Sequence, residues 1–230
     1  MKESPGVGRR SARRLALAAA LWAGIAWIPA DVAPASGAGG PHEARGRLEG
    51  RVSWSGGPLP EWESVTDVVV YLLGGDLEDA THTPAVPAVL AQKDFTYVPH
   101  VLPIAVRAAL TITNGDTALH NIHTYSKGRR RNPSFNRAQR AHTTLTTAFR
   151  APDSLLVLCD IHPQMEAHIM VLPNPYFAKP DEKGAYTITE IPAGRYELVA
   201  WHPSYTSVRD TVEVEAGRTT RTDLVFAAQP

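Results

Sequence analysis

The sequence lacks disulfide-forming cysteines, long apolar runs and any sustained helical pattern. Cys159 is the only cysteine among 230 residues, so the chain cannot form an internal disulfide. The apolar run at residues 15–28 is shorter than the roughly 20 residues that a membrane-spanning helix needs. No stretch keeps an apolar helical period over three or more turns. These absences argue against a disulfide scaffold, a membrane protein and a helical fold.

Common catalytic motifs are also missing. The sequence has no Gly-x-Ser-x-Gly, no His-Glu-x-x-His and no glycine-rich phosphate loop. Carboxylates do gather at Asp76, Glu78 and Asp79, but in a segment typical of a solvated turn. We therefore expect no substrate-turnover site and no enzyme.

The N-terminus has the pattern of an export signal. Five basic residues precede the apolar run, and small residues at 33–38 fit a signal-peptidase site. We expect residues 1–38 to be a signal peptide, with a periplasmic or secreted mature chain that has no membrane span. An uncleaved anchor is the alternative, and Arg13-Arg14 is only a weak twin-arginine signal.

The charge of the expected mature chain is slightly negative. Residues 1–38 contain five basic and two acidic side chains, which leaves 18 basic and 21 acidic residues and a net charge of −3. This balance argues against nucleic acid as a partner.

Short segments rich in Val, Ile, Thr and Tyr predict an all-β fold. The 19 prolines and 17 glycines separate these segments, and several alternate apolar with polar residues, as sandwich strands do. Residues 155–158 are apolar throughout and predict a central strand that ends at Cys159. We expect strands at residues 47–54, 67–73, 109–114, 143–149, 154–159, 167–172, 184–188, 196–201, 208–214 and 219–226.

Residues 159–165 read Cys-Asp-Ile-His-Pro-Gln-Met and bring three metal-binding side chains into one turn of chain. With His120 from a separate segment, they supply the two imidazoles, thiolate and thioether of a mononuclear blue-copper site. Zinc fits less well because structural zinc prefers several Cys or His ligands. A binuclear site with two bridging thiolates is excluded by the single cysteine. The simpler alternative is a buried, inert Cys159.

Other residues near these positions have less specific patterns. We expect Asn121 to bridge the two ligand segments, and His123 to be a structural or surface residue. His168 and His202 are expected to be satisfied structural residues, although either could supply a minor metal contact. The remaining histidines offer no cluster: His42, His82, His100 and His142.

Residues 114–123, which read Asn-Gly-Asp-Thr-Ala-Leu-His-Asn-Ile-His, and residues 159–165 together resemble the cupredoxins, in particular the amicyanin-type ligand loop. The resemblance covers residues 86–172. It implies a Greek-key β-sandwich that contains one mononuclear type 1 copper and transfers single electrons. By position, it implies the copper ligands His120, Cys159, His162 and Met165.

A second resemblance flanks the first. Residues 45–83, with Gly-Arg-Val at 50–52, and residues 174–228, with Ile-Pro-Ala-Gly-Arg-Tyr at 191–196, resemble a carboxypeptidase-regulatory-like (transthyretin-like) sandwich. We therefore expect the cupredoxin-like sandwich to be inserted in, or followed by, a second small β-sandwich. If it is inserted, residues 68–73 should pair with strands after residue 174.

Two functions stay open from the sequence. The first is an exported electron carrier that serves redox partner proteins. The second is a non-redox module that binds copper, carbohydrate or protein. A basic loop at residues 127–140 is a candidate docking patch for an acidic redox partner, although charge runs often mark only solvated loops. Its basic residues are Lys127, Arg129, Arg130, Arg131, Arg137 and Arg140.

Overall fold

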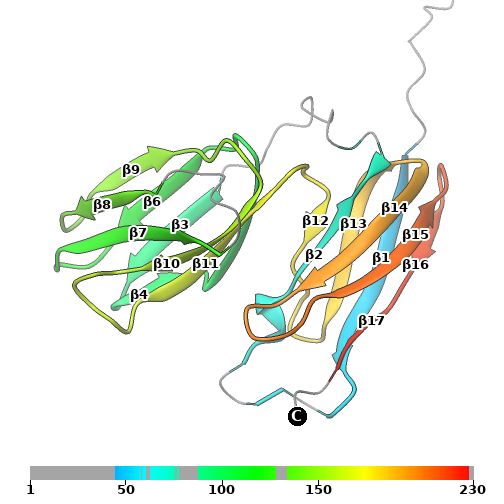
Figure 1. The fold of residues 1–230 in the computed structure, drawn as a ribbon, viewed down its shortest axis with the longest axis horizontal. Coiled ribbons are helices and arrows are strands. Elements are labelled where there is room, and N and C mark those ends of the chain that lie inside the picture. The colour runs from blue at the N-terminus through cyan, green and yellow to red at the C-terminus, as the bar shows by residue number, and fades with distance from the viewer. Residues whose placement is uncertain are drawn as a thin grey trace, which may run out of the picture. The chain divides into compact units, whose positions relative to one another are not determined.

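The computed structural model describes residues 45–57, 59–60, 63–75, 77, 88–127 and 134–227. These residues form seventeen β-strands in four sheets and contain no α-helix (Figure 1). The expected all-β fold class is confirmed. Within the same residues, no helix is long and apolar enough to cross a membrane. The expected signal peptide, residues 1–38, lies outside the described residues.

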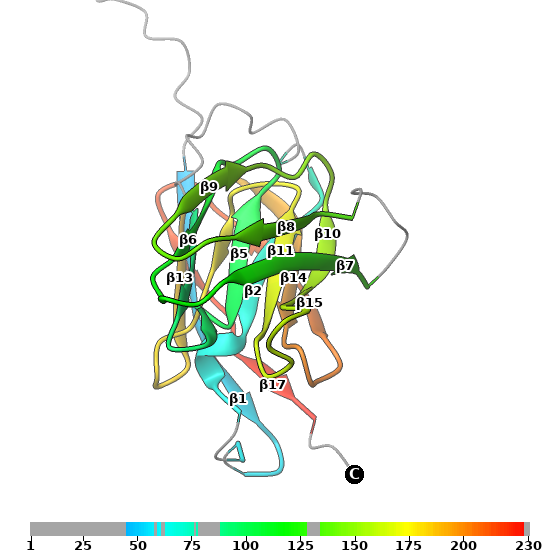
Figure 2. The ribbon, with the colours of Figure 1, turned by 90° about the vertical axis from the view of Figure 1, so that its left-hand side faces the viewer.

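Two sheets with the strand orders β5-β11-β10-β7-β8 and β4-β3-β6-β9 enclose one apolar core, and we call this unit the first sandwich (Figure 2). Its strands are β3 (Ala88–Lys93), β4 (Thr96–Val98), β5 (Val101–Ala105), β6 (Leu110–Asn114), β7 (His120–Ser126), β8 (Asn136–Gln139), β9 (Thr144–Thr147), β10 (Asp153–Leu158) and β11 (Glu166–Leu172). As expected from its apolar sequence, β10 is a central strand.

The other two sheets form the second sandwich around a separate core. Its strands are β1 (Arg45–Trp54), β2 (Val69–Leu73), β12 (Phe177–Ala178), β13 (Ala185–Pro192), β14 (Gly194–Trp201), β15 (Val208–Val214), β16 (Thr219–Arg221) and β17 (Leu224–Phe226). One sheet has the order β13-β1-β16 with β17 also on β1, and the other has the order β12-β2-β14-β15. Both N-terminal strands therefore pair with strands that follow residue 174.

Strands β2 and β11 are buried on both faces. Val70 and Leu72 point into the core of the second sandwich. The alternating residues Val69 and Tyr71 instead pack in a third apolar cluster that includes Met170 of β11. Because successive side chains of a strand point to opposite faces, a strand covered on both sides needs the uninterrupted apolar run that β2 has.

Two expected elements differ from the structure. Residues 219–226 form two strands, because the carbonyl oxygen of Thr222 packs against Gly50, where a Cβ atom would lie only 1.7 Å away. The backbone N–H of Arg51 then donates to the carboxylate of Asp223 at 2.7 Å instead of to a strand carbonyl. The segment expected to be a basic loop contains strand β8, which pairs with β7. Residues 128–133 of that segment lie outside the described residues.

Candidate metal centre

The loop between β10 and β11 brings Cys159, His162 and Met165 together. The backbone N–H of Met165 donates to the carbonyl oxygen of His162 at 3.0 Å, and that of Cys159 donates to the carbonyl oxygen of Met165 at 3.3 Å. These bonds close the loop on itself directly beyond the last residue of β10. Cys159 is 3% exposed and Met165 is fully buried in the same core.

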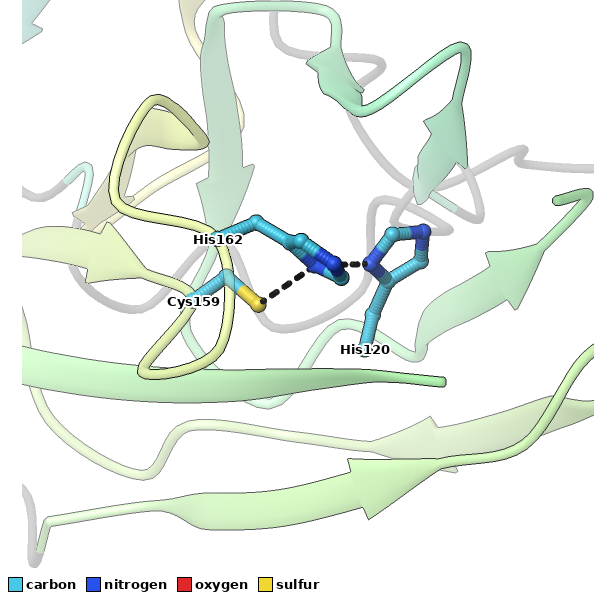
Figure 3. A group of neighbouring side chains, drawn as sticks. All are labelled: His120, Cys159 and His162. Atoms are coloured by element: carbon cyan, nitrogen blue, oxygen red, sulfur yellow. Dashed lines mark hydrogen bonds between the residues drawn. The ribbon is translucent and has the colours of Figure 1, made fainter. Parts of the chain in front are cut away.

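His120 reaches this loop because it is the first residue of β7, the antiparallel neighbour of β10. Nδ1 of His120 lies 3.0 Å from Nδ1 of His162. Nδ1 of His162 in turn lies 3.7 Å from Sγ of Cys159. Figure 3 shows the His162 ring between the thiol and the His120 ring. One donor atom from each of the three side chains lies within 4.8 Å of the others.

These separations fit the donor set of a single metal ion. Bonds of about 2.0 Å to nitrogen and about 2.3 Å to sulfur, arranged tetrahedrally, place donor atoms roughly 3.3–3.5 Å apart. The observed separations lie close to this range, so an ion could bind after small side-chain movements. The soft thiol among the donors favours copper or zinc over hard cations such as Mg²⁺.

Asp116 holds His120 in position, and sequence reasoning missed this role. Its carboxylate lies 2.8 Å from Nε2 of His120. It also accepts hydrogen bonds from the backbone N–H groups of Asp94 at 2.7 Å and Phe95 at 3.0 Å. When Nε2 carries the proton for this bond, the Nδ1 lone pair of His120 faces Nδ1 of His162 in the donor group. The only available signal was an aspartate four residues before a candidate ligand.

The pKa of Asp116 reflects these contacts. Burial alone would raise the pKa of this carboxyl group. The hydrogen bonds from the backbone of Phe95, from His120 and from the backbone of Asp94 outweigh burial and leave the pKa below its usual value. The carboxylate therefore stays ionised at neutral pH and can accept a hydrogen bond from Nε2 of His120.

Asn121 links the two ligand segments, as expected from its position. Its side-chain amide donates to the carboxylate of Asp160 at 2.9 Å, and its side-chain oxygen accepts the backbone N–H of Asp160 at 2.7 Å. Its own carbonyl oxygen accepts a 2.6 Å bond from the hydroxyl of Tyr97. These bonds fix the residue after His120 against the residue after Cys159.

Apolar side chains border the donor atoms. Phe95 is 42% exposed and meets the rings of His120 and His162 edge-on, at centroid distances of 5.4 and 4.9 Å. Leu119 and Ile161, the neighbours of the two histidines in sequence, are each 47% exposed. His162 is the half-buried member of the donor set, whereas His120 and Cys159 are buried.

The other histidines divide into two groups. His123 lies apart from the three donors and contacts Asp160 and the hydroxyl of Tyr125, in keeping with a structural role. The expectation that His100 belongs to no cluster is wrong. The expectation that His168 and His202 are satisfied is also wrong, because Nδ1 of His168 and Nε2 of His202 are buried without a hydrogen-bond partner among the described residues. His100, Glu166 and His168 form a second group whose donor atoms lie within 4.8 Å of one another. The parallel pairing of β5 with β11 creates this group, and sequence spacing does not reveal it.

The family comparison bears on the second of the two expected resemblances. Residues 162–227 match the model of the carboxypeptidase regulatory-like domain. This match confirms the resemblance for the C-terminal part of the chain, although residues 162–172 lie in the first sandwich. The match does not include β1 and β2, which complete the second sandwich. No curated protein matches the sequence.

Similar solved structures include cupredoxins. An oxidized amicyanin mutant is 18% identical over 37% of this chain and 82% of its own, with a TM-score of 0.34. A purple cupredoxin from Nitrosopumilus maritimus is 21% identical over 37% of this chain and 99% of its own, with a TM-score of 0.32. A copper-containing nitrite reductase from Thermus scotoductus SA-01 is 20% identical over 38% of this chain but only 22% of its own, with a TM-score of 0.33. With TM-scores this low, neither ligands nor activity are transferred to this chain.

Proposed function

We propose that the first sandwich binds one mononuclear copper ion through His120, Cys159, His162 and Met165, and that the protein carries single electrons between exported redox proteins. The observation that carries this proposal is the convergence of two imidazole nitrogens and a thiol, with separations of 3.0 and 3.7 Å. Copper held by two nitrogens, a thiolate and a weak thioether exchanges one electron.

The surrounding residues favour a site whose geometry changes little. Asp116 restrains the His120 ring, and Asn121 ties the backbone beside His120 to the backbone beside Cys159. Cys159 and Met165 are held in the close-packed core, where side chains have little room to move. A donor set fixed in this way lowers the structural rearrangement that a change of one electron would otherwise require.

The half-buried His162 is the natural point of contact with a partner. Phe95, Leu119 and Ile161 place exposed apolar surface next to the two histidines, and such patches mark interaction sites when they are contiguous. The expected basic loop at residues 127–140 would add long-range attraction for an acidic partner. If it does, the rate of electron exchange with an acidic redox protein should fall as ionic strength rises. A rate that is independent of salt would exclude steering by this loop.

Copper titration with absorption spectroscopy tests the site itself. Adding Cu(II) to the metal-free protein should produce one equivalent of an intense thiolate-to-copper charge-transfer band. The band should be lost in Cys159→Ser, His120→Ala and His162→Ala. It should remain in His142→Asn, which changes an exposed histidine on another loop. A colourless wild-type protein, or equal spectra for Cys159→Ser and wild type, would contradict the proposal.

Electrochemistry separates an electron carrier from a non-redox copper carrier. A copper-loaded electron carrier should show a reversible one-electron potential and should reoxidise without losing its metal. A copper carrier would instead release copper on reduction or show no reversible wave.

A further inference from the structure

A second group of ligand-type side chains shares no residue with the copper proposal. His100, Glu166 and His168 each place one donor atom within 4.8 Å of the others. His100 directly precedes β5, while Glu166 and His168 are alternate residues of β11 and lie on the same face of that strand. The backbone N–H of His168 donates to the carbonyl oxygen of His100 at 2.7 Å, which fixes the two segments against each other.

His168 turns one ring nitrogen toward this group. Its side chain is almost fully buried, and its Nδ1 atom has no hydrogen-bond partner within the described part of the chain. Its Nε2 atom lies 3.4 Å from the carboxylate of Glu166. Burial lowers the pKa of His168 to about 4, so the ring is neutral and keeps a free lone pair at pH 7. The neutral ring places Nε2 beside the Glu166 carboxylate, and its donor atom lies within 4.8 Å of those of Glu166 and His100, which makes His168 a candidate ligand.

His100 is oriented as metal-binding histidines usually are. Its Nδ1 atom lies 2.8 Å from a carboxylate oxygen of Asp67, in the 3-10 helix Val65–Asp67. A carboxylate on one ring nitrogen fixes the imidazole and raises the basicity of the other nitrogen, which is then available to the metal. The rings of His100 and His168 are 5.4 Å apart, and the ring of Trp201 lies 5.8 Å from that of His168.

We infer that His100, Glu166 and His168 bind one divalent zinc ion through two imidazole nitrogens and one carboxylate oxygen. Two histidines and a glutamate are a recognised zinc ligand set that leaves a fourth position for water or another ligand. Tetrahedral zinc needs donor atoms about 3.3 Å apart. His100 and Glu166 have 44% and 52% exposed side chains, so both can move toward the buried His168.

The inference is tested by zinc titration of the full chain in a Cys159→Ser background, which removes the only thiol and makes the result independent of the copper proposal. Bound zinc is counted by elemental analysis after dialysis, and affinity is measured by competition with a chromogenic chelator. His100→Asn and Glu166→Gln should each remove one zinc equivalent relative to the background, with affinity falling by more than about 100-fold. Asp67→Asn should keep that equivalent but bind it about 10- to 100-fold more weakly.

The matched control is His142→Asn, which removes an exposed histidine outside the group and should leave zinc binding at the background level. Far-ultraviolet circular dichroism verifies that each variant is folded. His100 and Glu166 are chosen over the buried His168 because substitutions at exposed positions preserve the core. Equal zinc stoichiometry and affinity in His100→Asn, Glu166→Gln and His142→Asn would overturn the inference, as would the absence of zinc binding in the background protein.

Discussion

The two sandwiches have the same layered architecture but different interiors. Among the described residues, the buried polar side chains lie in the first sandwich, with the exceptions of Asn174 and His202. Several of them connect to one another or to the candidate copper ligands, as in the bonds of Asp116 to His120 and of Gln92 to Gln139. The first sandwich therefore buries polar side chains beside the candidate copper ligands, whereas the core of the second sandwich is mostly apolar.

Two tyrosines of the second sandwich place their hydroxyl groups against backbone carbonyl oxygens. The hydroxyl of Tyr186 donates to the carbonyl oxygen of Thr222 at 2.6 Å, and the hydroxyl of Tyr196 donates to that of Pro192 at 2.9 Å. These tyrosines bury their rings while their hydroxyl groups complete turns of the backbone. Such bonds stabilise a fold without creating a chemical site.

The largest expected effect comes from truncating the core of the second sandwich. Phe226 is fully buried against Trp54, and Phe226→Ala should lower the free energy of unfolding by about 3–5 kcal/mol. The folded fraction should still give an unchanged copper charge-transfer band, because no copper donor contacts this core. Chemical denaturation and copper titration measure the two quantities. Loss of the band from fully folded Phe226→Ala protein would show that copper binding in the first sandwich depends on the core of the second.

Removing the carboxylate partner of His120 should lower the copper affinity more than the free energy of unfolding. Asp116→Asn should lower copper affinity by about 10- to 100-fold, because the His120 ring loses its ionic acceptor. Competition with a copper chelator measures this change. Asp210→Asn, which changes an exposed aspartate of β15, is the matched control and should have no effect. Equal affinities for the two variants would remove Asp116 from the site.

Each sandwich has a buried asparagine whose removal should have a different effect on copper binding. Asn121→Ala and Asn174→Ala each remove hydrogen bonds to backbone groups, in the first and second sandwich respectively. Both should cost about 1–2 kcal/mol of unfolding free energy. Only Asn121→Ala should change the copper affinity and the reduction potential. Unchanged values of both in Asn121→Ala would show that the bridge to Asp160 does not support the ligands.

The smallest expected effect is the acid sensitivity of the second sandwich. Burial lowers the pKa of His202, against the opposing charges of Glu63 and Asp67. His202 therefore binds a proton more readily in the unfolded chain, where its pKa is about 6.5, than in the folded chain. The contribution of the neutral ring to the free energy of unfolding is complete above that pH and is lost as the pH falls below it. The loss should be no more than about 1 kcal/mol between pH 7 and pH 5.5. Chemical denaturation of metal-free protein should show a shallower pH dependence for His202→Gln, and an identical one would contradict this assignment.

The strands that the sequence pattern revealed are mainly those with clear apolar periodicity. The range 208–214 agrees with β15, and the apolar run at 155–158 locates the central β10. Four of the missed strands, β4, β5, β8 and β12, lie at the edges of their sheets, whereas β3 lies between β4 and β6. Edge strands need little apolar alternation and tolerate proline, such as Pro103 in β5. A pattern that depends on burial therefore fails where burial is one-sided or slight.

The candidate site shows the same division between local and long-range information. Cys159, His162 and Met165 could be grouped from sequence because seven residues contain them all. The contacts of Asp116 with the turn at Asp94 and Phe95, and of His100 with His168, depend on pairing between distant strands. Residue type and spacing alone do not specify which strands become neighbours.

The pairing of β2 with both β12 and β14 has a consequence for how the chain acquires its structure. During translation, β1 and β2 leave the ribosome before the whole first sandwich, and their partners leave it afterwards. The first sandwich can therefore complete its own sheets while β1 and β2 of the second sandwich still lack their partner strands. Because Tyr71 and Phe177 are paired neighbours, a short linker that joins residue 73 to residue 174 should allow the outer unit, with Leu72 and Tyr176 kept in its core, to be produced without the inner one.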